Sequence, residues 1–232
     1  SGKRQPISAA PTLLRVGNAV AVAFGTGKYL EASDTRDTQV QTFYALLDAG
    51  DNLEDGSSGA IIGKERLLQT RSQADGIHTD TLRWGKQSLW SSGIHAGWFH
   101  DFAADSERQV AGGVLNGGLL YFSSLIPVTA TSDACSGGSA NSYAVDVAQG
   151  TLSVGASRIG LLAMPLIVDI GEAAYSARDS VGQRTRTIRS QLLQQGSGGV
   201  SAETVLERTL VVGRLSWRQI PNYPQLHRKA NP

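Results

Sequence analysis

Two carboxylates in an acidic, glycine-rich stretch, Asp51 and Asp55, could bind calcium through their side-chain oxygens. The EF-hand pattern places oxygen ligands at positions 1, 3 and 5, glycine at position 6 and glutamate at position 12. Counted from Asp51, position 3 is Leu53 and position 12 is Ile62, so two essential ligands fail. We interpret this stretch as a solvated loop and expect no metal in the chain, with Asp51 and Asp55 as the first candidate ligands to mutate.

Three of the four tryptophans have ring faces on which a cofactor or a sugar could stack. These residues are Trp84, Trp90 and Trp98. Aromatic side chains are also a major component of protein cores, where they bury large apolar areas. We interpret the three rings as structural packing, and we keep them as the candidate binding residues if the chain holds a ligand.

The tryptophan-rich stretch also holds three of the four histidines, His78, His95 and His100. A metal site needs histidine or carboxylate groups that converge on one face. His95 and His100 stand five residues apart, which places them on opposite faces of a strand. Asp80 and Asp101 are available nearby, but their spacing is not that of metal ligands. We therefore expect loop or packing histidines.

The pair Gly27-Lys28 invites comparison with a phosphate-binding loop. A P-loop requires glycine, four further residues, and then glycine, lysine and serine or threonine. Here Lys28 is followed by Tyr29, and Val22 stands where the first glycine belongs. Gly25 and Gly27 instead favour a tight turn at the end of a strand, because glycine adopts positive φ at little cost.

The sequence contains neither a Gly-x-Ser-x-Gly elbow nor a His-Glu-x-x-His motif. We predict that the chain is not an enzyme, and we expect no catalytic residue and no cofactor in it. Two alternatives stay open. One is a quinoprotein-like propeller enzyme, which would need clustered polar ligands and a catalytic aspartate, and the other is a carbohydrate-binding β module that uses the tryptophans.

The composition predicts an all-β chain with many turns. Glycine accounts for 27 of 232 residues and charged residues for 18%, against about 7% and 25% in typical domains. The 21 basic and 20 acidic residues nearly cancel, so no basic footprint for nucleic acid is present. No apolar stretch could span a bilayer, the first residues do not form a signal peptide, and the single cysteine, Cys135, cannot form an internal disulfide.

Two hairpins organise the expected strands. The first pairs Thr12–Val16 with Ala19–Phe24 across the turn Gly17-Asn18, and the small and β-branched residues of its second strand suit burial on both faces. The second hairpin turns at Asn116-Gly117, the strongest short turn signal in the chain. Ile61–Arg71 is the best candidate for a helix, although a strand fits it as well.

Each hairpin is followed by a polar loop and then by another strand, which contains Tyr44 in the first unit and Tyr143 in the second. A degraded third copy begins at 161–168 and continues at 190–196. Repeated β units of this kind predict part of a modified β-propeller, with about three irregular blades and long loops.

Short segments along most of the chain carry a family resemblance, and their order makes it specific. They are Gln5–Ile7, Gly25–Glu31, Gln41–Tyr44, Leu125–Pro127, Cys135–Ser139, Gln195–Ser197 and Gly213–Arg218. Together they resemble the C-terminal region of the PilC/PilY family, the type IV pilus biogenesis and tip-adhesion proteins.

This resemblance implies that residues 1–232 are the C-terminal portion of a PilY-type propeller, exported to the outer membrane or cell surface and associated with the pilus. It implies a non-enzymatic protein that supports pilus assembly and extension, counteracts retraction, and contributes to twitching motility and adhesion. Its partners would be minor pilins, the upstream part of the same protein and a host or abiotic surface, without nucleic acid or a membrane span. The family's calcium loop has no copy here, so calcium would belong to the full-length protein.

An incomplete propeller leaves open strand edges, which aggregate unless they are paired or covered. We expect the first strand, Thr12–Val16, or the last, Leu215–Ile220, to pair with upstream sequence or with another chain. We expect residues 228–232 to be frayed. Expressed alone, the chain should be poorly soluble or oligomeric.

Overall fold

The computed structural model describes residues 4–17, 19–48, 61, 63–73, 76–80, 82–83, 95–128, 138–172, 176–177 and 183–212. These residues confirm an all-β chain, and their one helix is the 3-10 helix η1 (Ala32–Arg36). The chain divides into two compact units. The first contains Ser1–Val168 with Leu192–Thr204, and the second contains Asp169–Gln191 with Val205–Pro232.

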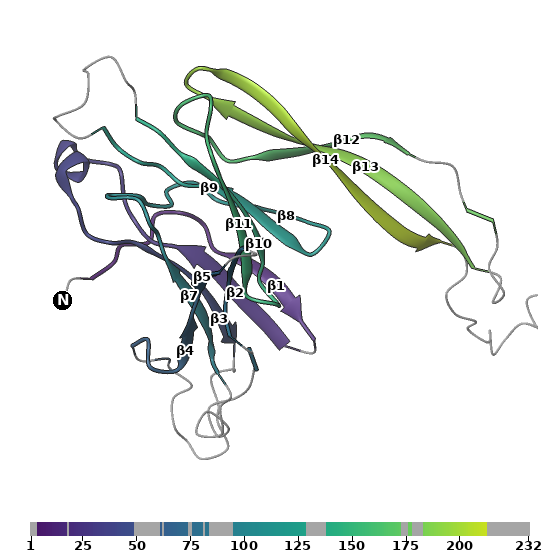
Figure 1. The fold of residues 1–232 in the computed structure, drawn as a ribbon, viewed down its shortest axis with the longest axis horizontal. Coiled ribbons are helices and arrows are strands. Elements are labelled where there is room, and N and C mark those ends of the chain that lie inside the picture. The colour runs from purple at the N-terminus through teal and green to yellow at the C-terminus, as the bar shows by residue number, and fades with distance from the viewer. Residues whose placement is uncertain are drawn as a thin grey trace, which may run out of the picture. The chain divides into compact units, whose positions relative to one another are not determined.

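The first sheet has five strands, which pair antiparallel except for the last (Figure 1). In sheet order they are β1 (Thr12–Val16), β2 (Ala19–Gly25), β3 (Thr42–Asp48), β7 (Gly97–Asp101) and β4 (Leu67–Gln69). The predicted first hairpin and the pairing of its second strand with the strand around Tyr44 are confirmed. Strand β1 lies at an edge of this sheet, and its pairing with upstream sequence or another chain stays a prediction.

The prediction that β2 is buried on both faces is wrong. Ala21 and Ala23 are buried, whereas Val20, which precedes them in the strand, is 39% exposed. The strand therefore alternates between a core face and an outer face, as expected for an antiparallel sheet with one covered side. The run of small residues reflects close packing on the core face.

The sequence left helix and strand open for Ile61–Arg71, and the structure shows strands. Its last residues enter two short strands, β4 and β5 (Arg71–Gln73), which belong to different sheets. Strand β4 pairs parallel with β7, so that Leu68 lies opposite Trp98. Buried Leu67 packs with Ala96 and Phe99 in a small cluster of its own, and this tertiary contact favours the strand over helix propensity.

The second sheet has six strands. In sheet order they are β5, β6 (Gly76–His78), β11 (Thr151–Ala156), β10 (Asn141–Asp146), β9 (Leu119–Ser123) and β8 (Val114–Asn116). The second hairpin is confirmed, with its turn one residue later than predicted. Asn116 pairs with Leu119, so the two loop residues are Gly117 and Gly118, with φ of 62° and 89°. Two successive positive φ values are typical of the type I′ turn.

One hydrophobic core joins the two sheets. Phe43 of the first sheet stacks on Phe122 of the second at 4.9 Å between ring centroids, and Phe122 stacks on Tyr143 at 4.7 Å. The repeated unit predicted from Tyr44 and Tyr143 is visible in the pairing, since each lies opposite a phenylalanine of the preceding hairpin. The two differ in environment, because Tyr143 is buried and Tyr44 is half-buried.

A third sheet contains the strands β12 (Leu166–Glu172), β13 (Arg184–Gly196) and β14 (Gly199–Val212), with β13 in the centre. None of the three sheets closes on itself within the described residues, and the propeller with its three blades stays a prediction. The expected last strand at 215–220 and the tail at 228–232 lie outside those residues. In the part of the chain that the structure describes, no helix has the length and apolarity needed to cross a membrane.

Candidate functional site

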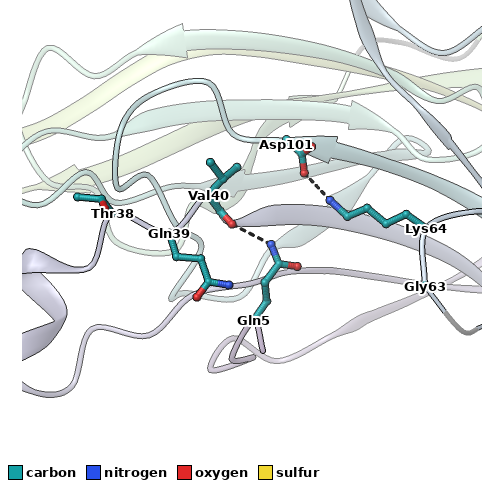
Figure 2. Close-up of a pocket in the computed structure, with 7 residues that line it drawn as sticks. All are labelled: Gln5, Thr38, Gln39, Val40, Gly63, Lys64 and Asp101. Carbon is teal, nitrogen blue, oxygen red and sulfur yellow. Dashed lines mark hydrogen bonds and ion pairs between the residues drawn. The ribbon is translucent and has the colours of Figure 1, made fainter. Parts of the chain in front are cut away.

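A pocket of about 880 Å³ with a mixed polar and apolar surface opens beside one end of the first sheet (Figure 2). Four separate segments contribute to it: the start of the chain, the loop before β3, the loop before β4 and the end of β7. Its lining residues are Gln5, Thr38, Gln39, Val40, Gly63, Lys64 and Asp101.

The strand register brings the polar groups of this pocket together. Thr42, the first residue of β3, pairs with Asp101, the last residue of β7. The Thr42 hydroxyl donates to Asp101 Oδ1 at 2.6 Å, and Lys64 Nζ donates to the same oxygen at 2.7 Å and to Thr42 Oγ1 at 3.2 Å. Gln69 Nε2 donates to Asp101 Oδ2 at 3.2 Å. The carboxylate is therefore held in a fixed orientation.

The Lys64 side chain lies across aromatic rings of the sheet. Its Nζ is 4.2 Å from the Phe99 ring centroid and 5.6 Å from that of Tyr44. An ammonium over a ring face is attracted by the ring's negative quadrupole. Together with the ion pair to Asp101, this contact places a well-defined cation at the pocket wall.

Two of the segments that carry the family resemblance meet at this pocket. Gln5 Nε2 donates to Val40 O and to Thr42 Oγ1, both at 2.9 Å, and Gln5 Oε1 accepts from the Tyr44 hydroxyl at 2.7 Å. The segment Gly25–Glu31 joins them, because Gly27 N donates to the carbonyl of the residue after Gln5. The resemblance therefore covers residues that touch one another around one site.

The loop that lines the pocket is held by a buried segment, Ser106–Gln109, which we call the strap. Arg108 of the strap is 1% exposed. Its guanidinium donates to the carbonyl oxygens of Lys28 and Asp34 at 2.9 Å and of Asp37 at 2.8 Å, while Nε donates to Ser106 O at 2.9 Å. Because Asp37 immediately precedes Thr38, Arg108 fixes the start of the pocket wall.

The strap also explains why glycine occupies positions 25 and 27. A Cβ on Gly27, whose φ is +128°, would clash with the Arg108 Cβ, and a Cβ on Gly25 would clash with the Gln109 side chain. Gln109 N donates to Thr26 O at 3.1 Å. The two glycines therefore permit close backbone approach of the strap. The tight turn predicted between them is wrong, because Gly25 ends β2 and Gly27 continues as a parallel bridge to Ile7.

Glu107 of the strap faces the second sheet. Its side chain is buried, and Oε1 accepts hydrogen bonds from Ser124 Oγ at 2.5 Å, Asn141 Nδ2 at 2.9 Å and the Tyr143 hydroxyl at 2.7 Å. Burial raises the pKa of Tyr143, and the neighbouring Glu107 carboxylate raises it further. The tyrosine stays protonated as a donor, so Glu107 links the strap to the second sheet, while Arg108 links it to the loop between β2 and β3.

The side chain of Asp34 stabilises the loop between β2 and β3 through contacts within that loop. It accepts backbone hydrogen bonds from Leu30 N at 2.9 Å and Glu31 N at 3.0 Å, and Lys28 Nζ lies 3.1 Å from its other oxygen. These backbone bonds, with Lys28 as a smaller cause, lower the pKa of Asp34 to about 2. The carboxylate therefore remains charged, and able to accept these hydrogen bonds, down to strongly acidic pH.

None of the candidate residues proposed from the sequence lines this pocket in the part of the chain that the structure describes. Trp98 is fully buried, tilts against Phe43 at 5.6 Å, and donates from Nε1 to Val147 O at 2.9 Å. A ligand therefore has no exposed face of Trp98 on which to stack. The other candidates lie outside the described residues, and their roles stay predictions; these are Trp84, Trp90, Asp51, Asp55 and Cys135. Among the residues with a described placement, no group of three metal-ligating side chains occurs.

His100 packs in the interior and pairs with Thr70, whose Oγ1 lies 2.8 Å from its Nδ1. Burial lowers the pKa of His100, while the charges of Glu107 and Asp101 oppose this shift. The folded state thus favours the neutral ring. Its stabilising effect is fully present above the unfolded pKa of about 6.5 and is lost as the pH falls below it.

We therefore expect the chain to lose thermal stability as the pH is lowered from about 7 to about 5, where histidines take up protons. The measurement is the melting temperature across this range for the native chain and for His100→Gln. The variant should show a shallower decline, because its amide does not titrate. Equal slopes in the two proteins would show that protonation of His100 does not drive the loss.

No known protein-family profile matches the chain, and no solved structure matches it. Two curated proteins of Xylella fastidiosa strain Temecula1 do match, and each is called a type IV pilus biogenesis factor PilY1 homolog. One is 31% identical over 163 residues, which is 66% of this chain, and the other is 28% identical over 141 residues, or 58%. The chain belongs to the PilY1 family.

The resemblance to the PilC/PilY family is thereby confirmed. The match covers 10% and 11% of the two PilY1 homologs, so this PilY1-family chain spans about a tenth of the length of the relatives it matches. Sequence reasoning noted the segments around Gln5 and Thr42 but missed the roles of Lys64 and Arg108. Both stand in stretches without a motif, and only their tertiary contacts reveal them.

Proposed function

We propose that this chain is the C-terminal part of an exported PilY1-family protein that acts at the type IV pilus on the outer membrane or cell surface. It supports pilus assembly and extension, counteracts retraction, and contributes to twitching motility and adhesion, without catalysing a reaction. The observation that carries the proposal is the 31% identity over 163 residues to a PilY1 homolog.

The architecture supports a binding role within this proposal. Two sheets, each containing a hairpin followed by a third antiparallel strand, share one aromatic core. Adjacent blades of a propeller would share a core in this manner, and we propose that the two sheets belong to such an array. The partners we propose are minor pilins and the upstream part of the same protein, which would also carry any calcium site.

The alternative of a quinoprotein-like enzyme gains no support from the described contacts, and an absorbing cofactor in purified protein would favour it. The carbohydrate-binding alternative gains support from the pocket, although through other residues than the tryptophans. Lys64, Asp101 and Gln5 present polar groups at an open surface, whereas Trp98 is enclosed.

The function is tested by deleting the segment that encodes this chain and counting pili on the cell surface. We expect fewer pili and smaller twitching zones than in the parent strain, and restoration by an intact copy of the gene. Wild-type numbers of surface pili in the deletion strain would contradict the proposal. A variant that lowers the stability of the fold, such as Arg108→Met, should reproduce the deletion.

A further inference from the structure

We propose that the pocket beside Asp101 and Lys64 binds an uncharged, polyhydroxylated ligand, namely a neutral saccharide. The proposal deepens the proposed function and rests on it, because a protein at the cell surface is exposed to saccharides. Binding itself depends only on the pocket residues, and it can be measured on the full-length protein that contains this chain.

The charges of the pocket favour a neutral ligand. Lys64 and Asp101 form an ion pair at 2.7 Å, and their side chains are 38% and 32% exposed. A phosphate, sulfate or carboxylate that approached Lys64 would also approach the Asp101 carboxylate, and like charges at this range repel. A cation would meet the corresponding repulsion from Lys64. A ligand without charge meets neither penalty.

The side chains of the pocket have both hydrogen-bond donors and hydrogen-bond acceptors that are not fully used within the protein. The Lys64 ammonium has three N–H groups and donates two hydrogen bonds. Asp101 Oδ2 accepts one bond, as does Gln5 Oε1, and each oxygen has a further lone pair. The Thr38 hydroxyl has no partner in the structure as described. The wall thus offers donors and acceptors side by side.

A saccharide hydroxyl matches such a wall, because each O–H group can donate to one neighbour and accept from another. Two adjacent hydroxyls could bridge Lys64 and Asp101, the first accepting from Nζ and the second donating to Oδ2. Charge-assisted hydrogen bonds of this type are stronger than those between neutral groups. The side chain of Val40, 58% exposed, supplies an apolar surface for the C–H face of a sugar ring.

Hydrogen bonds within the protein already position two side chains of the pocket, Gln5 and Asp101, before a ligand arrives. Gln5 is held by three hydrogen bonds, and Asp101 by three. Because ordering side chains on binding costs free energy, a preformed site retains more of the interaction energy as affinity. A volume of about 880 Å³ falls in the range of roughly 300–1,000 Å³ that small-molecule sites have, and it accommodates one sugar unit or a short oligosaccharide.

The test is a titration of the full-length protein that contains this chain with defined probes, followed by ligand-observed NMR or calorimetry. The neutral probes are the methyl glycosides of glucose, galactose, mannose, N-acetylglucosamine and N-acetylgalactosamine, and the anionic probes are inorganic phosphate and N-acetylneuraminic acid. We expect saturable binding of at least one neutral glycoside and none of the anions. If no neutral probe binds at concentrations up to about 50 mM, which is well above the dissociation constant of a weak millimolar site, the proposal is overturned.

Two variants locate the binding. Asp101→Asn removes the charge of the acceptor, and Thr38→Phe fills the pocket without breaking a described contact. Each should weaken binding at least about tenfold, which corresponds to about 1.4 kcal/mol. Asp80→Asn is the matched control, because Asp80 also pairs with a cation, Arg71 at 3.6 Å, on the second sheet.

Unchanged affinity in Thr38→Phe would show that a bound sugar lies elsewhere, and it would overturn the assignment even if Asp101→Asn fails to fold. Failure of this proposal is distinguishable from failure of the proposed function. Fewer surface pili in the deletion strain, together with no glycoside bound by the native protein, would refute the saccharide site alone.

Discussion

Arg108→Met should lower the free energy of unfolding by about 3–5 kcal/mol, the range for breaking a buried charged network. Methionine keeps much of the side-chain volume but removes every donor. The carbonyl oxygens of Lys28, Asp34 and Asp37, which Arg108 now binds, would lose their partners. Chemical denaturation of the native chain and the variant measures the difference.

The control for this prediction is Arg71→Met. Arg71 belongs to an exposed ion pair, with its side chain 72% exposed, and exposed pairs contribute about 0–1 kcal/mol. If Arg108→Met is no more destabilising than Arg71→Met, the strap does not hold the loop. Because Asp37 adjoins the pocket wall, Arg108→Met should also reduce binding of any glycoside that the native chain binds.

Trp98→Ala should destabilise the chain by about 3–5 kcal/mol, as expected when a fully buried tryptophan leaves a cavity. Trp98 contributes to the core of both sheets and satisfies the Val147 carbonyl through its indole N–H. Denaturant midpoints report the loss.

Trp98→Phe separates packing from hydrogen bonding in this prediction. It keeps a ring but removes the donor to Val147, so its cost should be smaller, about 1–3 kcal/mol. A near-neutral Trp98→Ala would contradict the assignment of Trp98 to the core and would reopen its role as a stacking surface.

The strands were predictable where local patterns decide them. The pairing Thr12–Val16 with Ala19–Phe24 follows from two apolar runs around a two-residue turn, and the turn after Asn116 follows from its glycines. The degree of burial was not predictable, because small residues in β2 suit both a strand covered on two faces and a strand that packs closely on one. Only the position of the second sheet distinguishes them.

The strap could not be inferred from the sequence. Ser106–Gln109 is polar, and a polar run is usually a solvated loop, yet this one is buried between two sheets. Its burial is compensated by partners distant in sequence, with Arg108 bonding to residues more than 70 positions away. Such compensation leaves no periodic or local signature.

Part of the pocket could be predicted from the sequence. The segments around Gln5 and Thr42 were singled out through the family resemblance, and the structure shows that they touch. Lys64 and Asp101 join them through the pairing of β3 with β7 and the parallel strand β4. Pairings between strands so far apart in the chain depend on tertiary packing, so no reading of single segments could bring these residues together.

The central claim is that this chain acts in type IV pilus extension, and the most direct test counts surface pili in two genetic backgrounds. Deleting the segment should reduce surface pili in cells with an active retraction motor, and inactivating that motor should bring pili back, since the chain is proposed to counteract retraction. Surface pili unchanged by the deletion in cells that retract normally would contradict the account.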